Sequence, residues 1–118
     1  MTDSEKPCLF CDIACGARPA NIVYRDEEVT AFVDINPVAP VHVLLIPNRH
    51  ISSLNEADGE SREILGRLLL AAPRVAAIMN VEKTGYRVVI NTGPNAGQTV
   101  YHLHVHLLGG RPLAFRTQ

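Results

Sequence analysis

Short apolar runs separated by polar turns predict strands along most of the chain. The first two runs flank the polar turn 26–28 and predict a hairpin. Pro47 ends the third run, because proline cannot donate a hydrogen bond to a strand ladder. The predicted strands cover 22–24, 29–33, 42–46, 87–91 and 99–108.

One longer segment has the spacing of a helix. Apolar residues recur every three or four positions between 61 and 80, which predicts a helix with its apolar stripe facing the core. Pro73 removes one backbone hydrogen bond inside this segment, so the sequence predicts either a kink or two abutting helices. A shorter helix is predicted over 10–15, and residues 1–7 are predicted to form a loose tail.

These elements predict an α+β fold, in which a mostly antiparallel sheet of about five strands packs against the long helix and the short N-terminal helix. The pattern does not fix the strand order. The 118 residues contain no repeat or linker, so a single domain over 1–118 is expected. A chain of this length can bury a core without disulfide bonds.

Composition and charge exclude several classes of protein. Eleven Lys and Arg against 12 Asp and Glu give a net charge of −1, which argues against a nucleic-acid-binding protein. Apolar residues make up 47% of the chain, which argues against disorder, and no apolar run is long enough to span a membrane. The polar N-terminus carries no apolar signal core, so a cytoplasmic location with reduced thiols is expected.

Three of the five histidines occupy alternate positions: His102, His104 and His106. Residues two apart in a strand share a face, so the three imidazoles are expected side by side, with the apolar residues between them facing the core. Packing alone seldom explains three imidazoles in register. They fit either a zinc site with an open position for water or an imidazole nucleophile that attacks phosphorus.

The loop before these histidines favours the second alternative. It carries amide, glycine and hydroxyl groups at Asn91, Gly97, Gln98 and Thr99. Glycine lets main-chain N–H groups approach an anion closely, and a nest of such groups holds phosphate. Beside three histidines, this loop favours chemistry at phosphorus over metal-assisted hydrolysis.

Cys8 and Cys11 have the spacing that supplies two of the four ligands of a tetrahedral zinc site. The alternative is a pair of buried cysteines in a helical turn that holds no metal. Cys15 has no partner at this spacing and is interpreted as a small apolar residue.

The sequence resembles the histidine triad (HIT) superfamily, whose motif of alternating histidines is matched over 102–108. The resemblance covers about residues 8–112, and the runs 97–102 and 108–111 look most like the Hint branch, the nucleoside phosphoramidate hydrolases. It implies a HIT-like fold, a homodimer and a purine nucleotide ligand such as AMP. It also implies cleavage of nucleoside 5′-phosphoramidates to nucleoside monophosphates, with no metal required at phosphorus.

The resemblance implies roles for individual residues. His104 would attack the α-phosphorus and carry a nucleotidyl intermediate, His106 would contact the phosphate oxygens, and His42 would support their hydrogen bonds. Thr99 stands where the family usually has Ser, and it keeps the hydroxyl. The implied nucleotide-binding residues are Leu9, Phe10, Ile13, Phe32 and Ile35 around the base, Asp34 at the ribose, Asn91, Gly97 and Thr99 at the phosphate, and Gln98 near the leaving group.

Many bacterial relatives carry the cysteine pair. The resemblance then implies a structural zinc site, closed to water, whose ligands are Cys8, Cys11, His50 and His102. The sequence departs from the family at Pro73, inside the helix that helps to form the dimer, and in having no Trp, which some relatives carry in a C-terminal tail. Two alternatives stay open: a dinucleoside polyphosphate hydrolase, and a nucleotide-binding or interaction module with little turnover.

Overall fold

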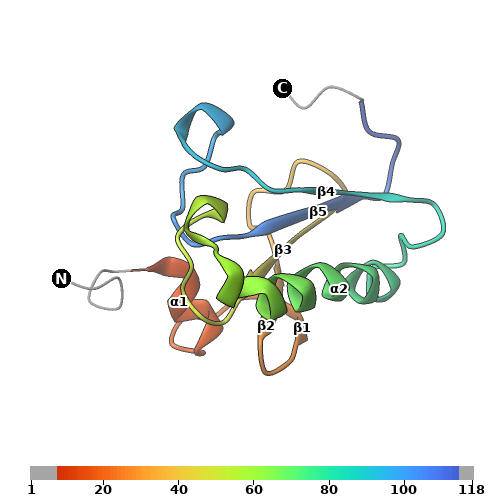
Figure 1. Cartoon of the computed structure of the whole chain (residues 1–118). Coiled ribbons are helices and arrows are strands. Elements are labelled where there is room, and N and C mark those ends of the chain that lie inside the picture. Colours follow the sequence, from red (N-terminus) through yellow and green to blue (C-terminus); the bar gives the residue numbers. More distant parts are fainter. Residues whose placement is uncertain (1–7, 115–118) are drawn as a thin grey trace.

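The computed structural model describes residues 8–114, so the predicted tail over 1–7 lies outside the described residues. Figure 1 shows the arrangement of the helices and strands. In chain order they are α1 (Leu9–Ala14), β1 (Ile22–Arg25), β2 (Val29–Val33), β3 (Val41–Pro47), α2 (Arg62–Ile78), β4 (Tyr86–Val89) and β5 (Val105–Gly109). Three single 3₁₀ turns lie in the connections: η2 (Leu54–Glu56), η3 (Gly59–Ser61) and η4 (Pro94–Ala96).

The five strands form one sheet in the order β1-β2-β3-β5-β4, and all neighbouring strands are antiparallel. This confirms the predicted α+β fold. The order, which the sequence pattern left open, places the last strand between β3 and β4. His106, on β5, therefore comes to lie beside His42, on β3.

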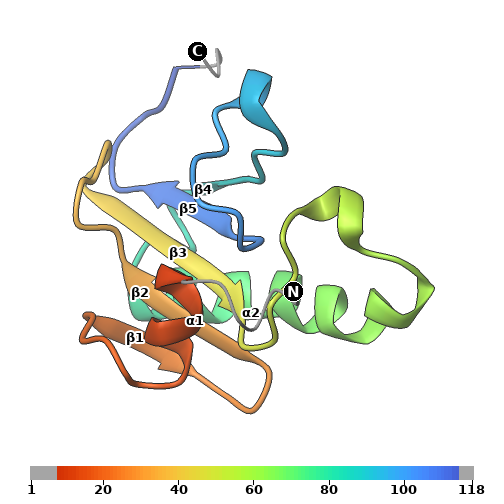
Figure 2. The same cartoon turned by 90° about the vertical axis from the view of Figure 1, so that its left-hand side faces the viewer.

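The two helices cover opposite faces of the sheet. Alternate side chains of β3 point to opposite sides, and they enter two different apolar clusters. Val43 and Leu45 pack in the cluster that includes α2. Leu44 and Ile46 pack in a smaller cluster with Phe10 of α1. Figure 2 shows α1 in front of the sheet and α2 behind it.

Helix α2 continues through Pro73 as one helix of 17 residues, so the alternative of two abutting helices is wrong. Proline leaves the carbonyl of Leu69, four residues earlier, without its helical partner. Pro73 is exposed and the Leu69 side chain is 51% exposed, so water can reach this side of the helix. Among the described residues, no helix has the length and apolar character needed to cross a membrane.

Strand β5 begins at Val105, so the predicted strand over 99–108 is wrong for its first six residues. The register of β3 and β5 ends where Leu45 pairs with Val105. Continued by two residues, it would set Leu103 against Pro47, which has no N–H to donate. The N–H of Leu103 instead donates to the carbonyl of Ile51, at 2.6 Å.

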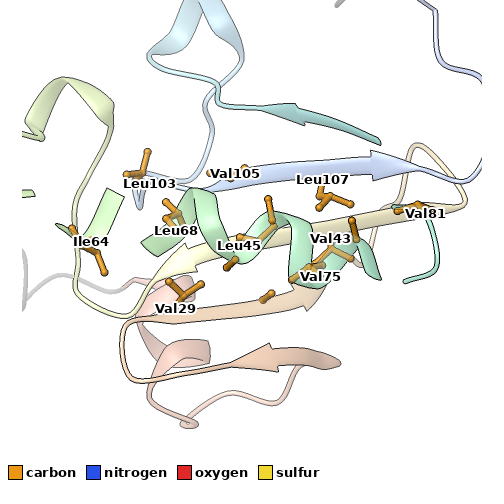
Figure 3. Packing of buried hydrophobic residues seen from close by; sticks show 14 of the residues in the cluster. Val29, Val43, Leu45, Ile64, Leu68, Val75, Val81, Leu103, Val105 and Leu107 are labelled. Atoms are coloured by element: carbon orange, nitrogen blue, oxygen red, sulfur yellow. The ribbon is translucent and has the colours of Figure 1, made fainter. Parts of the chain in front are cut away.

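The alternation of side chains nevertheless persists through this irregular segment. Leu103, Val105 and Leu107 all belong to the cluster that packs against α2, as Figure 3 shows. Because the residues between them point the other way, the histidines at 102, 104 and 106 face the side of the sheet that α1 covers.

The chain leaves β5 through Gly110, which has a φ of +95°. A Cβ atom at this position would lie 2.8 Å from Cβ of Pro40, so only glycine fits the turn. The turn brings Arg111 back to the loop between β2 and β3, where its Nη2 donates to the carbonyl of Val38 at 3.1 Å. The same loop carries a main-chain N–H that orients one of the histidines.

We expect Leu68→Ala to lower the free energy of unfolding by about 2–5 kcal/mol, because it leaves a cavity beneath α2. Leu68 is 1% exposed. Chemical denaturation measures the loss. Leu54→Ala makes the same deletion where the side chain is 43% exposed, and it should cost less than about 1 kcal/mol. Equal losses from the two variants would contradict this packing.

Candidate active site and metal centre

The histidines gather on the face of the sheet that α1 covers. His106 pairs directly with Leu44 across β5 and β3. His42, two residues before Leu44 on the same face, is therefore the diagonal neighbour of His106. The ring centroids of His42 and His106 are 5.2 Å apart, and those of His104 and His106 are 5.0 Å apart. The structure thus brings the three predicted catalytic residues together.

A main-chain carbonyl determines the proton position on His104. Its Nδ1 lies 2.7 Å from the main-chain oxygen of His102. A carbonyl oxygen only accepts hydrogen bonds, so Nδ1 must carry the proton. The other ring nitrogen, Nε2, is left with a lone pair, as an imidazole nucleophile requires.

The main-chain N–H of Val38 determines the proton positions on the rings of His42 and His106. The N–H of Val38 donates to Nδ1 of His42 at 3.1 Å, so His42 carries its proton on Nε2. This Nε2 lies 2.9 Å from Nδ1 of His106 and donates to it. His106 in turn carries its proton on Nε2. A ring that offers an N–H therefore stands next to His104, which offers a lone pair.

Burial keeps this pair of imidazoles neutral near pH 7. Burial, together with the neighbouring rings of His104 and His42, lowers the pKa of His106 to about 4, although the Asp34 carboxylate opposes the shift. Burial also lowers the pKa of His42, again against the effect of Asp34. The neutral tautomers described above are therefore the forms that meet a ligand near pH 7.

Three of the residues predicted around a base form one apolar cluster next to the histidines. Phe10, Ile13 and Phe32 are each no more than 6% exposed, and they pack together. The Phe10 ring meets the His104 ring edge to face, with centroids 5.2 Å apart. The Phe10 ring thus packs directly against the proposed nucleophile.

The other base and sugar candidates lie nearer the surface. Leu9 is 38% exposed, and Ile35 is 91% exposed. Asp34 directs Oδ2 to a point 3.3 Å from Nε2 of His42, and its side chain is 18% exposed. Its Oδ1 accepts the N–H of Asn36 at 2.8 Å. The carboxylate therefore lies at ion-pair distance from His42 and remains partly accessible to a ligand.

The loop between β4 and β5 carries the predicted phosphate-binding residues. Asn91 donates from Nδ2 to the carbonyl of Ala96 at 2.9 Å, which closes the loop. Gly97 has a φ of +85°, a conformation that favours glycine. Thr99 is exposed. The role of these residues at a phosphate stays a prediction.

Gln98 differs from its loop neighbours, because its side chain is 4% exposed and makes three hydrogen bonds within the protein. Its Oε1 accepts from the N–H of Gly93, and its Nε2 donates to the carbonyls of Ser52 and Val100. Gln98 thus holds the loop against a segment 46 residues earlier in the chain. Sequence reasoning missed this role and the role of Val38, because neither carries a local pattern.

A second cluster consists of Cys8, Cys11, His50 and His102, whose sulfur and nitrogen atoms all lie within 4.8 Å of one another. The four Sγ to Nδ1 distances are 3.3–3.5 Å, and the two Nδ1 atoms are 3.3 Å apart. Bonds of about 2.3 Å to sulfur and about 2.0–2.1 Å to nitrogen give tetrahedral edges of about 3.5 and 3.3 Å. The donor set therefore fits a tetrahedral zinc ion.

Hydrogen bonding and burial leave the ring of His102 neutral, with a lone pair available for a metal ion. Nε2 of His102 donates to the carbonyl of Pro47 at 2.8 Å, so the lone pair on Nδ1 faces the sulfurs. Burial is the main cause that lowers the pKa of His102 to about 4, which keeps the ring neutral. Burial and the adjacent Cys8 raise the pKa of the Cys11 thiol to about 12. A cation in the cluster would counter this and stabilise the thiolates.

The short helix α1 explains the cysteine spacing. Cys8 is its N-cap, and the sulfur accepts the N–H of Cys11 at 3.3 Å. This cap sets both sulfurs at the start of the helix. A helix of six residues is not stable alone, so its position depends on what its ends and its buried side chains contact.

Comparisons with known proteins agree with this architecture. A purine nucleoside phosphoramidase of Escherichia coli (strain K12) is 48% identical over 105 residues, covering 89% of this chain and 88% of that protein. The solved structure of a HIT family hydrolase from Legionella pneumophila has a TM-score of 0.90 at 43% identity, covering 92% of this chain and 97% of that one. A histidine triad protein from Clostridium difficile has a TM-score of 0.91 at 38% identity, covering 98% of this chain and 99% of that one.

A family model also matches the sequence directly. The model of the HIT domain matches residues 16–113, which include the three alternating histidines and exclude the two N-terminal cysteines of the second cluster. Over most of its length, therefore, this chain belongs to the HIT domain family.

Proposed function

We propose that this protein hydrolyses nucleoside 5′-phosphoramidates, with purine nucleotides as substrates and His104 as the nucleophile. The observation that carries the proposal is the pairing of opposite groups on adjacent rings: the lone pair of His104 Nε2 next to the N–H of His106. The E. coli relative that is 48% identical is a purine nucleoside phosphoramidase, which supports the substrate class.

In the first step, Nε2 of His104 forms a bond to phosphorus and the phosphorus–nitrogen bond of the substrate breaks. The electron pair of that bond leaves with the amine, which takes up one proton from solvent. The His104 ring becomes cationic, and its Nδ1–H donates more strongly to the carbonyl of His102 as the charge develops. The N–H of His106 donates to a phosphoryl oxygen, and one such oriented donor contributes about 2.7–4 kcal/mol.

In the second step, water attacks the same phosphorus and the bond to His104 breaks. The bonding electrons return to Nε2, which restores the lone pair. Water supplies the new oxygen of the nucleoside monophosphate as a hydroxyl group, and its other proton goes to solvent and replaces the one that the amine took. One water is consumed, and one amine and one nucleoside monophosphate are released.

The nucleotide is assigned to the groups around this centre. Phe10, Ile13 and Phe32 supply apolar surface for the base, and the exposed Leu9 and Ile35 border it. Asp34 has a partly accessible carboxylate for the ribose hydroxyls. The proposed phosphate contacts come from the loop between β4 and β5, at Asn91, Gly97 and Thr99, and Gln98 supports this loop near the leaving group.

We also propose that the four-residue cluster holds a structural zinc ion, bound by Cys8, Cys11, His50 and His102. The tetrahedral distances and the orientation of His102 support this assignment. Four protein ligands leave no open position for water, so when bound the ion would cross-link the chain and leave the chemistry to His104.

We further propose a homodimer that covers the outer face of α2 and the open edge of β4. Leu69, Leu70 and Ile78 are 51–69% exposed on this helix, and large apolar side chains open to solvent favour contact with a second copy of the chain. β4 is an outermost strand, so one row of its backbone groups has no partner within the described sheet. A cytoplasmic location stays a prediction.

His104→Ala should reduce kcat for release of AMP from adenosine 5′-phosphoramidate by about 10³-fold or more, because it removes the attacking nitrogen. Chromatographic quantification of AMP measures this. An unchanged unfolding midpoint and metal content serve as controls. A variant within about tenfold of wild type would show that His104 is not the nucleophile. A folded wild type that cleaves diadenosine polyphosphate faster, or only binds AMP, would overturn the phosphoramidase proposal.

Cys11→Ser should lower bound zinc from about one ion per chain to a small fraction, and it should lower the unfolding midpoint, because it removes one ligand of four. Elemental analysis and thermal unfolding give the two readings. Cys15→Ser, which makes the same change at an exposed position outside the cluster, is the matched control and should change neither. Wild-type protein that stays metal-free after purification with added zinc would contradict the assignment.

Leu70→Glu should convert the dimer to monomers, because it buries a charge in the apolar face of α2. Sedimentation equilibrium gives the mass directly. Leu54→Glu carries the same change outside α2 and should leave the dimer intact. A wild-type protein that sediments as a monomer at high concentration would refute this interface.

A further inference from the structure

The main-chain N–H of Val38 sets the direction of the hydrogen bond between two histidines. It donates to Nδ1 of His42, so His42 donates from Nε2 to Nδ1 of His106. The opposite direction is chemically possible, because either imidazole of such a pair can be the donor. In that case His42 would carry its proton on Nδ1, and His106 would present a lone pair at Nε2 instead of an N–H.

The segment that supplies this N–H lies at the surface. Val38 belongs to the loop between β2 and β3 and is 64% exposed. When an exposed loop moves away, water takes its place in a hydrogen bond at little cost. A peptide N–H can only donate, whereas water can donate or accept. The direction of the histidine pair therefore depends on how firmly Val38 is held.

Arg111 ties this loop to the end of β5. Its Nη2 donates to the carbonyl of Val38 at 3.1 Å. The chain reaches this position through Gly110, where a Cβ atom would lie 2.8 Å from Cβ of Pro40. The close approach of the two segments brings the guanidinium onto the loop, and a charged donor makes a stronger hydrogen bond to a carbonyl than a neutral one does.

These contacts form a closed circuit around the histidine pair. From Val38 it runs through His42 on β3 to His106 on β5, and Arg111, just after β5, returns to the carbonyl of Val38. β3 and β5 pair directly, with His42 opposite Leu108, so the sheet fixes the two histidines relative to each other. The exposed loop is the part of the circuit outside the sheet, and Arg111 fastens it.

We propose that Arg111 is a positioning residue for the reaction, because by holding Val38 it keeps the proton of His106 on Nε2. The inference rests on the proposed function, in which this N–H donates to a phosphoryl oxygen. Without the guanidinium, water competes with Val38 at Nδ1 of His42. Part of the protein then holds the reversed tautomers, in which a lone pair of His106 repels the phosphoryl oxygen.

The direction of the pair can be read without turnover by NMR on zinc-loaded protein with ¹⁵N-labelled histidine. A ring nitrogen that carries a proton and one with a lone pair differ in ¹⁵N chemical shift. In nucleotide-free wild type, Nδ1 of His106 should have the shift of a lone-pair nitrogen and Nε2 that of a protonated one. In Arg111→Met, which removes the donors and keeps an unbranched side chain, the two shifts should move toward each other. Wild-type shifts in this variant would overturn the proposal.

Two further variants separate positioning from a general effect of the substitution. Arg62→Met makes the same change at an exposed position at the start of α2 and should leave the histidine shifts unchanged. Arg111→Lys keeps a charged donor and should give shifts between those of wild type and Arg111→Met. Equal unfolding midpoints show that the variants are folded. An equal effect of Arg62→Met would contradict the proposal, and so would a larger effect of Arg111→Lys than of Arg111→Met.

Kinetics show whether the direction of the pair acts on the reaction. With adenosine 5′-phosphoramidate, Arg111→Met should lower kcat by about three- to tenfold with KM nearly unchanged, because one hydrogen bond to the reacting group is weakened. Arg62→Met should keep the wild-type kcat. A change confined to KM would mean that Arg111 binds the substrate and does not position His106. Absence of turnover in wild type, beside the expected NMR changes, would instead remove the proposed function and leave the effect of Arg111 on the histidines in place.

Discussion

A neutral imidazole has one N–H and one lone pair, and the main chain decides which ring nitrogen has which throughout this site. The carbonyl of Pro47 holds the proton of His102, the carbonyl of His102 holds that of His104, and the N–H of Val38 occupies the lone pair of His42. Each contact leaves the opposite nitrogen available for its proposed role, as metal ligand in His102 and as nucleophile in His104, or as donor to the next ring in His42. These roles therefore depend on the path of the backbone, which the sheet and its loops hold in place.

Pro47 determines the backbone path of the segment before β5. It has no N–H, so pairing between β3 and the last segment of the chain stops, and the N–H of Leu103 turns to Ile51. The carbonyl of Pro47 is still available and accepts the proton of His102. One residue thus ends the ladder and orients the first histidine of the triad. The break also gives His102 and His104 a backbone that β-pairing with β3 does not constrain, while their side chains keep the facing of a strand.

Short-range periodicity explains what the sequence could predict. The alternation from His102 to His106 correctly indicates a shared face. The helical spacing of α2 correctly indicates most of its buried side, although Leu69, which shares that spacing, is 51% exposed. The start of β5 could not be predicted, because it depends on Pro47, a residue far away along the chain. The role of Gln98 could not be predicted either, because its partner Ser52 is 46 residues earlier in the chain. The histidine tautomers could not be predicted, because each depends on a main-chain group whose position follows from the assembled sheet.

The three histidines of the triad therefore belong to two neighbouring clusters, and helix α1 contacts both. His102 lies with the cysteines, and His104 lies with His106. His102 turns its lone pair toward the cysteines, and its carbonyl, on the same residue, holds the proton of His104. Phe10 lies between the two cysteines in α1, and its ring contacts both of these histidines, with centroids 6.0 and 5.2 Å away. Because α1 has only six residues, the contacts that fix the sulfurs also fix this aromatic ring. The cluster at the end of α1 and the proposed nucleophile His104 therefore differ in their proposed chemistry but are coupled mechanically. A displacement of α1 would move the Phe10 ring that packs against His104.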